Sequence, residues 1–174
     1  MPLLNSVTTP YAEAFLQVSE ELNQTEEIVF QSKEILSLLK DSPELEKALA
    51  SPILEKDSKK TIIVELFSGK INQSLLNLLK LLADRQRIGI LVPILERFLE
   101  LYRENSNIAL ATVTSAVELS EEQINLLSKK ISAIAGTEKL ELVTKTDSTL
   151  IGGFVASVGS KVIDASLASQ IRKL

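Results

Sequence analysis

Residues Leu150 to Leu174 read LIGGFVASVGSKVIDASLASQIRKL and decide the fold of the last part of the chain. Phe154, Ala156 and Val158 alternate with Val155 and Ser157, as the two faces of a half-buried strand do. Gly159-Ser160 supplies a tight turn before a second apolar stretch at Val162-Ile163. This pattern predicts a β-hairpin.

A short helix is predicted to follow the hairpin. Asp164 or Ser166 can accept hydrogen bonds from the free backbone amides of its first turn. Leu167, Ile171 and Leu174 are spaced so that they fall on one helical face. The glycines of the stretch are explained by turns, because neither of the phosphate-binding spacings, GxxxxGK and GxGxxG, is present.

The composition favours a packed core and excludes several classes of function. The length of 174 residues is enough for one ordinary domain or two small ones, and the hydrophobic fraction of 45% is enough for a packed core. The chain has no cysteine and no histidine, so it lacks thiolates and the commonest metal ligand and general base. The net charge of -4 argues against a nucleic-acid surface. We expect no catalytic residue, no cofactor and no metal site.

No membrane span is expected from the hydropathy pattern. Met1 to Ser6 carries no basic segment of the kind that begins a signal peptide. The longest apolar runs, such as Ile88 to Leu95, are far shorter than the roughly 18 residues that cross a bilayer. Any membrane association is therefore expected to come through partner proteins.

Residues 1–105 show the apolar spacing of six amphipathic helices. Their predicted starts are Thr9-Pro10, Thr25, Ser42-Pro43, Asp57, Asn72 and Ile90. In the first helix Pro10 is expected at the first helical position, and Tyr11, Phe15, Val18 and Leu22 lie on one face. Short connections between amphipathic helices predict an antiparallel bundle.

The pattern changes after the polar stretch Arg103 to Asn107, where we place a domain boundary. The segment Ile108 to Ala116 is rich in alternating apolar and β-branched residues, which predicts a strand. Ser120 and Gln123 form a capping box for a helix that is expected to end at Gly136. With a further strand from Leu140, the predicted fold is mainly α: a six-helix antiparallel bundle over residues 1–105 and a small α/β domain over residues 106–174.

The fifth predicted helix is apolar around more than one face. Its leucines between Leu75 and Leu82 cover an arc of about 220°, whereas a surface helix usually buries a stripe of roughly 100°. The helix is either central to the bundle, or it presents a second face to an amphipathic partner helix. The segment Asp84 to Arg87 that follows is either a partner contact or a charged helix end.

Four stretches resemble motifs of the delta subunit of F-type ATP synthases, which is called oligomycin sensitivity-conferring protein in mitochondria. They are TPYAEAFLQV (Thr9 to Val18), LLNLLKLLADRQRIGIL (Leu75 to Leu91), ATVTSAVELSEEQ (Ala111 to Gln123) and the signature around VGSKVIDAS (Val158 to Ser166). The last is the most specific, and it is most similar to cyanobacterial and plastid members of the family.

The resemblance implies a mechanical role without catalysis. In that family the six-helix domain binds the N-terminal helix of an alpha subunit on the catalytic head, and the C-terminal domain binds the b-type subunits of the peripheral stalk. Such a stator subunit keeps the head from turning with the rotor during proton-driven ATP synthesis. The implied location is peripheral, on the cytoplasmic or stromal side of a thylakoid membrane, with a bacterial plasma membrane as the alternative.

The resemblance also implies two sets of contact residues. Those expected to bind the alpha-type helix are Tyr11, Ala14, Leu76, Leu79 and Ala83. Those expected to bind the stalk are Gly152, Gly153, Phe154, Asp164 and Ile171. Because the chain ends at Leu174, sooner after the signature than many relatives do, the extent of the stalk contact is left open. A free-standing helical adaptor that binds amphipathic helices is the alternative function.

Overall fold

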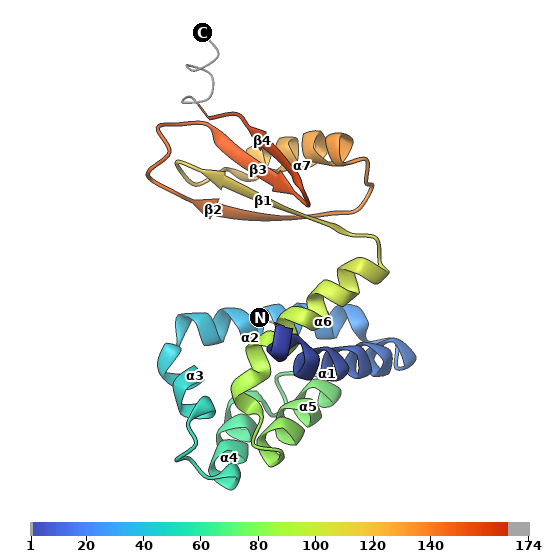
Figure 1. Cartoon of the computed structure of the whole chain (residues 1–174), viewed down its shortest axis with the longest axis vertical. Helices are drawn as coiled ribbons and strands as arrows, with labels where there is room; N and C mark the ends of the chain where they lie inside the picture. The colour runs from blue at the N-terminus through green and yellow to red at the C-terminus, as the bar shows by residue number, and fades with distance from the viewer. Residues whose placement is uncertain (1, 167–174) are drawn as a thin grey trace. The chain divides into compact units, whose positions relative to one another are not determined.

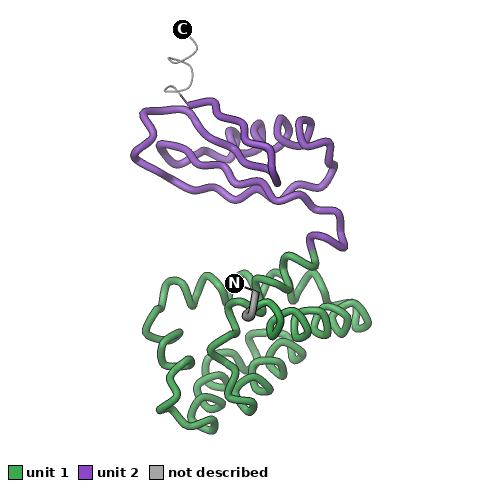
Figure 2. The backbone as a smooth tube through the Cα atoms, in the orientation of Figure 1, with its two compact units in different colours: residues 1–102 green, residues 103–174 purple. Residues whose placement is uncertain are grey.

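The computed structural model of the chain describes residues 2–166 (Figure 1). The chain divides into two compact units, Met1–Tyr102 and Arg103–Leu174 (Figure 2). Over the described residues, a mainly helical first part is followed by a mixed sheet with one helix, and the predicted fold class is confirmed.

The helices before the sheet are connected by short turns, as predicted. They are α1 (Pro2–Glu21), α2 (Thr25–Asp41), α3 (Pro43–Ala50), α4 (Lys56–Phe67), α5 (Gln73–Asp84) and α6 (Leu91–Asn105), with a 3-10 turn η1 (Ile88–Ile90) before α6. The predicted starts at Ser42-Pro43 and Asn72 are confirmed, because Ser42 and Asn72 are the residues that precede α3 and α5.

Helix α1 begins earlier than its sequence predicts. It starts at Pro2 and contains Pro10 in its interior, so the expected start at Thr9-Pro10 is wrong. A proline inside a helix removes one backbone hydrogen bond and crowds the preceding turn. Thr8, which precedes the proline, is buried. Tertiary packing of the turn before Pro10 therefore outweighs the local preference of proline for a first helical turn.

Helix α5 is central to the bundle. Five of its leucines are buried, namely Leu75, Leu76, Leu78, Leu79 and Leu82. Leu81 is the exception, with 44% of its surface exposed. The wide apolar arc of this helix is thus explained mostly by burial inside the bundle, and its exposed part is narrow.

A polar network anchors the start of α5 to α2. The side-chain oxygen of Asn72 accepts a hydrogen bond of 2.9 Å from the backbone amide of Ser74, which caps the helix. The Asn72 side-chain amide donates to Gln24 and to Glu27, at 3.1 Å in each case. The backbone amide of Asn72 donates to Gln31 at 2.6 Å. The buried polar groups of Asn72 are therefore satisfied by its neighbours.

The second unit is a four-stranded sheet with a helix on one face. Its elements are β1 (Ala109–Ser115), α7 (Glu121–Ala135), β2 (Leu140–Thr146), β3 (Phe154–Val158) and β4 (Lys161–Asp164). The strand order is β2-β1-β3-β4, with β1 and β2 parallel and the other pairs antiparallel. Leu127 and Ile131 of α7 form a core with Ala111, Val113 and Ala156 of the sheet (Figure 1).

The predicted hairpin and the predicted helix ends are found in this unit. Val158 of β3 pairs with Lys161 of β4 across the turn Gly159-Ser160. The capping box of Ser120 and Gln123 begins α7, and Gly136 ends it with a φ of 68°. The helix expected after the hairpin, with Leu167, Ile171 and Leu174, lies outside the described residues.

The division between the units falls within α6, after Tyr102. The helix continues to Asn105, and Asn107 then has a φ of 53° in the left-handed region. Part of the polar stretch that we expected to separate two domains is therefore helical. The boundary at residue 105, with a separate binding function on each side, stays a prediction.

Candidate functional site

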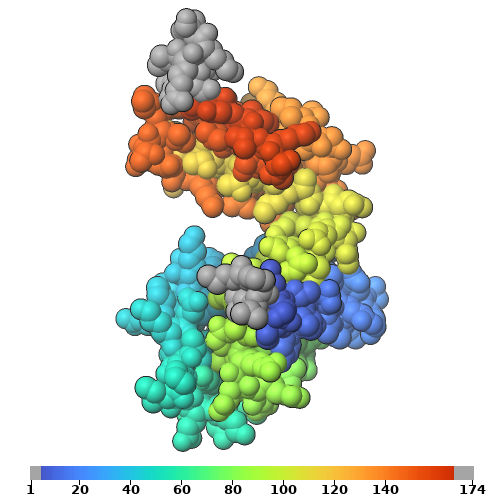
Figure 3. Space-filling view, in the orientation of Figure 1, coloured from blue at the N-terminus to red at the C-terminus, as the bar shows by residue number. Residues whose placement is uncertain are grey.

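A groove with a volume of about 290 Å³ lies between α1 and α5. It is lined by Tyr11, Ala14, Phe15 and Val18 from α1 and by Ser74, Asn77, Leu78 and Leu81 from α5. Both sets have the spacing i, i+3, i+4, i+7, so each is one stripe along one helix. The space-filling view shows the dark-blue surface of α1 beside the green surface of the later helices (Figure 3).

The groove has an apolar floor and partly apolar walls. Phe15 and Leu78 are buried, whereas Val18 and Leu81 are 42% and 44% exposed. Ala14 is small, so a second helix can approach α1 closely at this position. Two exposed apolar side chains on either side of an apolar floor are a suitable surface for the apolar face of an amphipathic helix.

The burial of α1 explains why Val18 is available at this surface. Ala12, Leu16 and Ser19 are buried, and the Ser19 hydroxyl donates to the Leu16 carbonyl at 2.7 Å. The buried face is thus rotated away from the predicted stripe of Tyr11, Phe15, Val18 and Leu22, of which only Phe15 is buried. Of the face predicted to be apolar, Phe15 is therefore buried in the core, while Tyr11 and Val18 lie at the groove.

The structure separates the five residues that were expected to bind an alpha-type helix. Tyr11 and Ala14 line the groove. Leu76, Leu79 and Ala83 do not, because they are buried in the bundle with exposures of 3%, 0% and 0%. At 100° per residue they lie about 180° around α5 from the stripe of Ser74 to Leu81. Ser74 and Asn77 are the signal in the sequence that identifies the outward stripe.

Tyr11, in the wall of the groove, contacts Arg87. The Arg87 Nη1 atom donates a hydrogen bond of 3.0 Å to the Tyr11 hydroxyl. The guanidinium carbon lies 5.9 Å from the centre of the Tyr11 ring, within the range of a cation–π interaction. Arg87 follows the C-terminal end of α5, so this contact joins the two helices that form the groove.

An ion pair lies at the same end of α5. The Lys60 Nζ atom of α4 is 2.8 Å from the Asp84 carboxylate. This hydrogen bond lowers the pKa of Asp84 below its ordinary value of 3.8 and raises the pKa of Lys60 above 10.5. Both groups are partly exposed, so the pair orients the end of the helix and contributes modestly to stability.

Four of the residues expected to bind the stalk meet in what we call the terminal junction, Gly152-Gly153-Phe154 with Asp164-Ala165-Ser166. Gly152 and Gly153 have φ values of 145° and 77°, which favour glycine. A Cβ atom on Gly153 would overlap the Ala165 carbonyl and lie 2.9 Å from the Ser166 Cα atom. Ile171, the fifth expected contact, lies outside the described residues.

Two hydrogen bonds complete the terminal junction. The Ala165 amide donates to the Phe154 carbonyl at 3.0 Å, and the Ser166 amide donates to the Asp164 carboxylate at 2.9 Å. The glycine pair and the end of β4 therefore form one packed unit.

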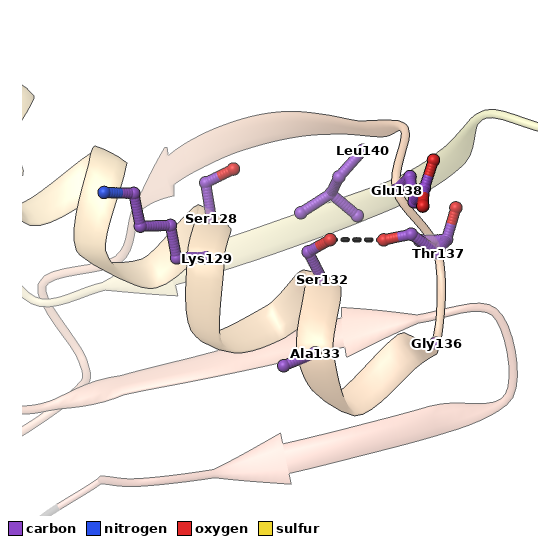
Figure 4. A pocket seen from close by; sticks show the side chains of 8 residues that line it. All are labelled: Ser128, Lys129, Ser132, Ala133, Gly136, Thr137, Glu138 and Leu140. Atoms are coloured by element: carbon purple, nitrogen blue, oxygen red, sulfur yellow. Dashed lines mark hydrogen bonds between the residues drawn. The ribbon is translucent and has the colours of Figure 1, made fainter.

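A second hollow lies where α7 ends and β2 begins (Figure 4). The Ser132 hydroxyl donates to the Thr137 carbonyl, while the charged groups of Lys129 and Glu138 lie at opposite ends of the view. The residues that the structure describes contain no group of three or more His, Cys, Asp or Glu side chains that could hold a metal ion. Within residues 2–166, no helix has the length and hydrophobicity that a bilayer span requires.

Comparison with known proteins identifies a family. The family model described as ATP synthase delta (OSCP) subunit matches residues 7–174. ATP synthase subunit delta of Prochlorococcus marinus strain AS9601 is 78% identical over 174 residues, which cover 100% of this chain and 97% of that protein. The same subunit of strain MIT 9303 is 60% identical, with 100% of this chain and 96% of that protein covered.

The fold is also found in a solved structure. A chain of the Toxoplasma gondii mitochondrial ATP synthase hexamer matches 95% of this chain with a TM-score of 0.74, and 93% of that chain is covered. At 20% identity this match concerns the fold alone. The family matches confirm the resemblance found in the terminal signature, and the chain belongs to the ATP synthase delta (OSCP) subunit family.

Proposed function

We propose that this chain links the catalytic head of an F-type ATP synthase to its peripheral stalk. It is a delta-type, non-catalytic stator subunit, and its family membership supports this role over a free-standing adaptor. A stator transmits torque through protein contacts, so its chemistry lies in surfaces that bind other subunits. The α1–α5 groove and the terminal junction are the two such features that the family resemblance singles out.

The α1–α5 groove is the proposed site for the N-terminal helix of an alpha subunit. Its two stripes of equal spacing are the observation that carries this proposal, because a third helix can pack along both at once. Val18 and Leu81 would lose exposed apolar surface on binding, which favours association. Tyr11 would contribute an aromatic anchor.

The second unit is the proposed site for the b-type subunits of the stalk. The terminal junction supports this, because four of the five residues expected to bind the stalk lie in it. Association with the membrane then comes through the complex. The cyanobacterial relatives favour a thylakoid membrane, on its cytoplasmic or stromal side, over a bacterial plasma membrane.

Removal and return of the subunit test the proposed function. Membrane vesicles from cells lacking the gene should hydrolyse ATP but should not couple proton flow to ATP synthesis. Addition of the purified chain should restore synthesis, whereas addition of the variant Leu81→Asp, which places a charge in the groove, should not. Undiminished synthesis without the chain would refute the stator role. Failure of the chain to co-purify with alpha and b-type subunits would favour the adaptor.

A further inference from the structure

Arg87 contacts a residue of the groove without lining the groove itself. Its side chain contacts Tyr11 by a hydrogen bond and lies near the ring, yet Arg87 is not among the residues that line the groove. Arg87 can therefore influence the groove through the position of Tyr11.

The backbone around Arg87 is fixed on both sides. The Gln86 amide donates to the Ala83 carbonyl at 3.0 Å, and the Arg87 amide donates to the Leu82 carbonyl at 2.7 Å. With Gln86 at a φ of 54°, this is the hydrogen-bond pattern of a Schellman motif at the end of α5. The next residue, Ile88, is buried. The Arg87 side chain therefore starts from a well-defined position beside α1.

We propose that Arg87 is a positioning residue that holds the Tyr11 ring in the wall of the α1–α5 groove and so sets the affinity of the groove for a partner helix. This inference rests on the proposed function of the groove. Arg87 prepares the site before the partner arrives, because the Tyr11 side chain is already ordered by a charged donor. The planar guanidinium can donate to the hydroxyl and lie near the ring at once, which an ammonium cannot do equally well.

The expected effect follows from the cost of ordering one side chain. Loss of the Arg87 contact frees Tyr11, which must then be ordered again on binding, so affinity should fall roughly 3- to 10-fold. A direct charge contact between Arg87 and the partner would behave differently, because salt would screen it. Positioning predicts a loss that is independent of salt.

The test is a calorimetric titration of the full chain with a synthetic peptide, the N-terminal segment of the alpha subunit from the same genome. Arg87→Met should weaken binding roughly 3- to 10-fold, equally at about 0.05 M and 0.5 M NaCl. Arg87→Lys should recover only part of the affinity. In the double variant with Tyr11→Ala, which removes both the ring and the acceptor, the Arg87→Met change should cost little more. Additive losses would overturn the proposal.

Arg85→Met is the matched control, since it removes the same charge from the same turn and Arg85 does not line the groove. Its affinity should equal that of the wild-type chain, and a loss equal to that of Arg87→Met would show a general charge effect and overturn the proposal.

A fluorine NMR measurement tests the position of Tyr11 directly. With 3-fluorotyrosine incorporated and Tyr102→Phe as background, the Tyr11 fluorine signal of the free chain should change in Arg87→Met and not in Arg85→Met. If the wild-type chain does not bind the peptide, the proposed function fails and this inference falls with it. If the wild-type chain binds and Arg87→Met binds equally well, this inference alone is wrong.

Discussion

At the scale of single residues, Gly153 illustrates how the terminal junction depends on the absence of a side chain. Gly153→Ala should lower the free energy of unfolding of the second unit by about 2–5 kcal/mol, from the positive φ and from overlap with the Ala165 backbone. Gly159→Ala is the matched control: its φ is 57° but no atom lies within 4 Å of the added Cβ, so about 1–2 kcal/mol is expected. Urea unfolding followed through the amide signals of β3 measures both, and equal losses would contradict the close approach.

Asp84 is the residue through which pH should act on the end of α5. Its pKa is lowered chiefly by the Lys60 hydrogen bond, so the stability that the pair contributes is fully present above the unfolded value of 3.8 and is lost as the pH falls through the lower folded pKa. The raised pKa of Lys60 sets the upper limit, because its contribution is fully present below 10.5 and is lost as the pH rises through the higher folded pKa. Lys60→Met should raise the pKa of Asp84 toward 3.8 in a carbon-13 NMR titration.

Lys56→Met provides the comparison for this titration. Lys56 lowers the pKa of Asp84 by charge alone and is the weakest of its causes, so the rise should be smaller than for Lys60→Met. An equal or larger rise would show that the hydrogen bond is not the dominant cause.

At the scale of elements, the turn that ends α5 contains a backbone conformation that favours glycine, although the residue there is Gln86. Gln86 occupies the left-handed position after the helix, where α7 has Gly136. Gln86→Gly should therefore stabilise the first unit by up to about 1 kcal/mol, and Gly136→Ala should destabilise the second by about the same amount. Urea unfolding of the two variants tests this, and a destabilised Gln86→Gly would mean that the Gln86 side chain makes a contribution larger than its backbone strain.

The starts of the helices show which features of the fold can be predicted from the sequence and which cannot. The starts of α3, α5 and α7 were predictable because Pro43, Asn72 and Ser120 act within one turn of the backbone. The start of α1 was not, because burial around Thr8 overrides the local preference of Pro10. Local chemistry thus determines most helix ends, and distant packing determines the exceptions.

The groove shows the same limit for the candidate site. The leucines of α5 cover an arc of about 220°, so this apolar arc alone did not distinguish Leu76 and Leu79 from Leu81. The polar residues Ser74 and Asn77 mark the outward stripe once the bundle is known. The place of the groove, between α1 and α5, was predictable from the family resemblance; three of its five expected contacts were not.

At the scale of the whole molecule, the chain should behave as two separately folding units. Limited digestion with a protease that cleaves after glutamate should cut first at Glu104, because the polypeptide between α6 and β1 is short of regular structure and Glu104 is exposed at its edge. Mass spectrometry of the early fragments identifies the site. A first cut inside α2 or α7, whose exposed glutamates serve as internal controls, would count against the division.

The central claim is that the α1–α5 groove binds the N-terminal helix of an alpha subunit, and calorimetric titration of the full chain with that peptide tests it most directly. Leu81→Asp should reduce affinity at least about tenfold, because a carboxylate would be buried against an apolar helix face. Phe30→Asp, an equally drastic change at a 61% exposed apolar residue of α2 outside the groove, should leave affinity unchanged. Thermal melts should show both variants folded. Wild-type affinity in folded Leu81→Asp, or an equal loss in Phe30→Asp, would contradict the account.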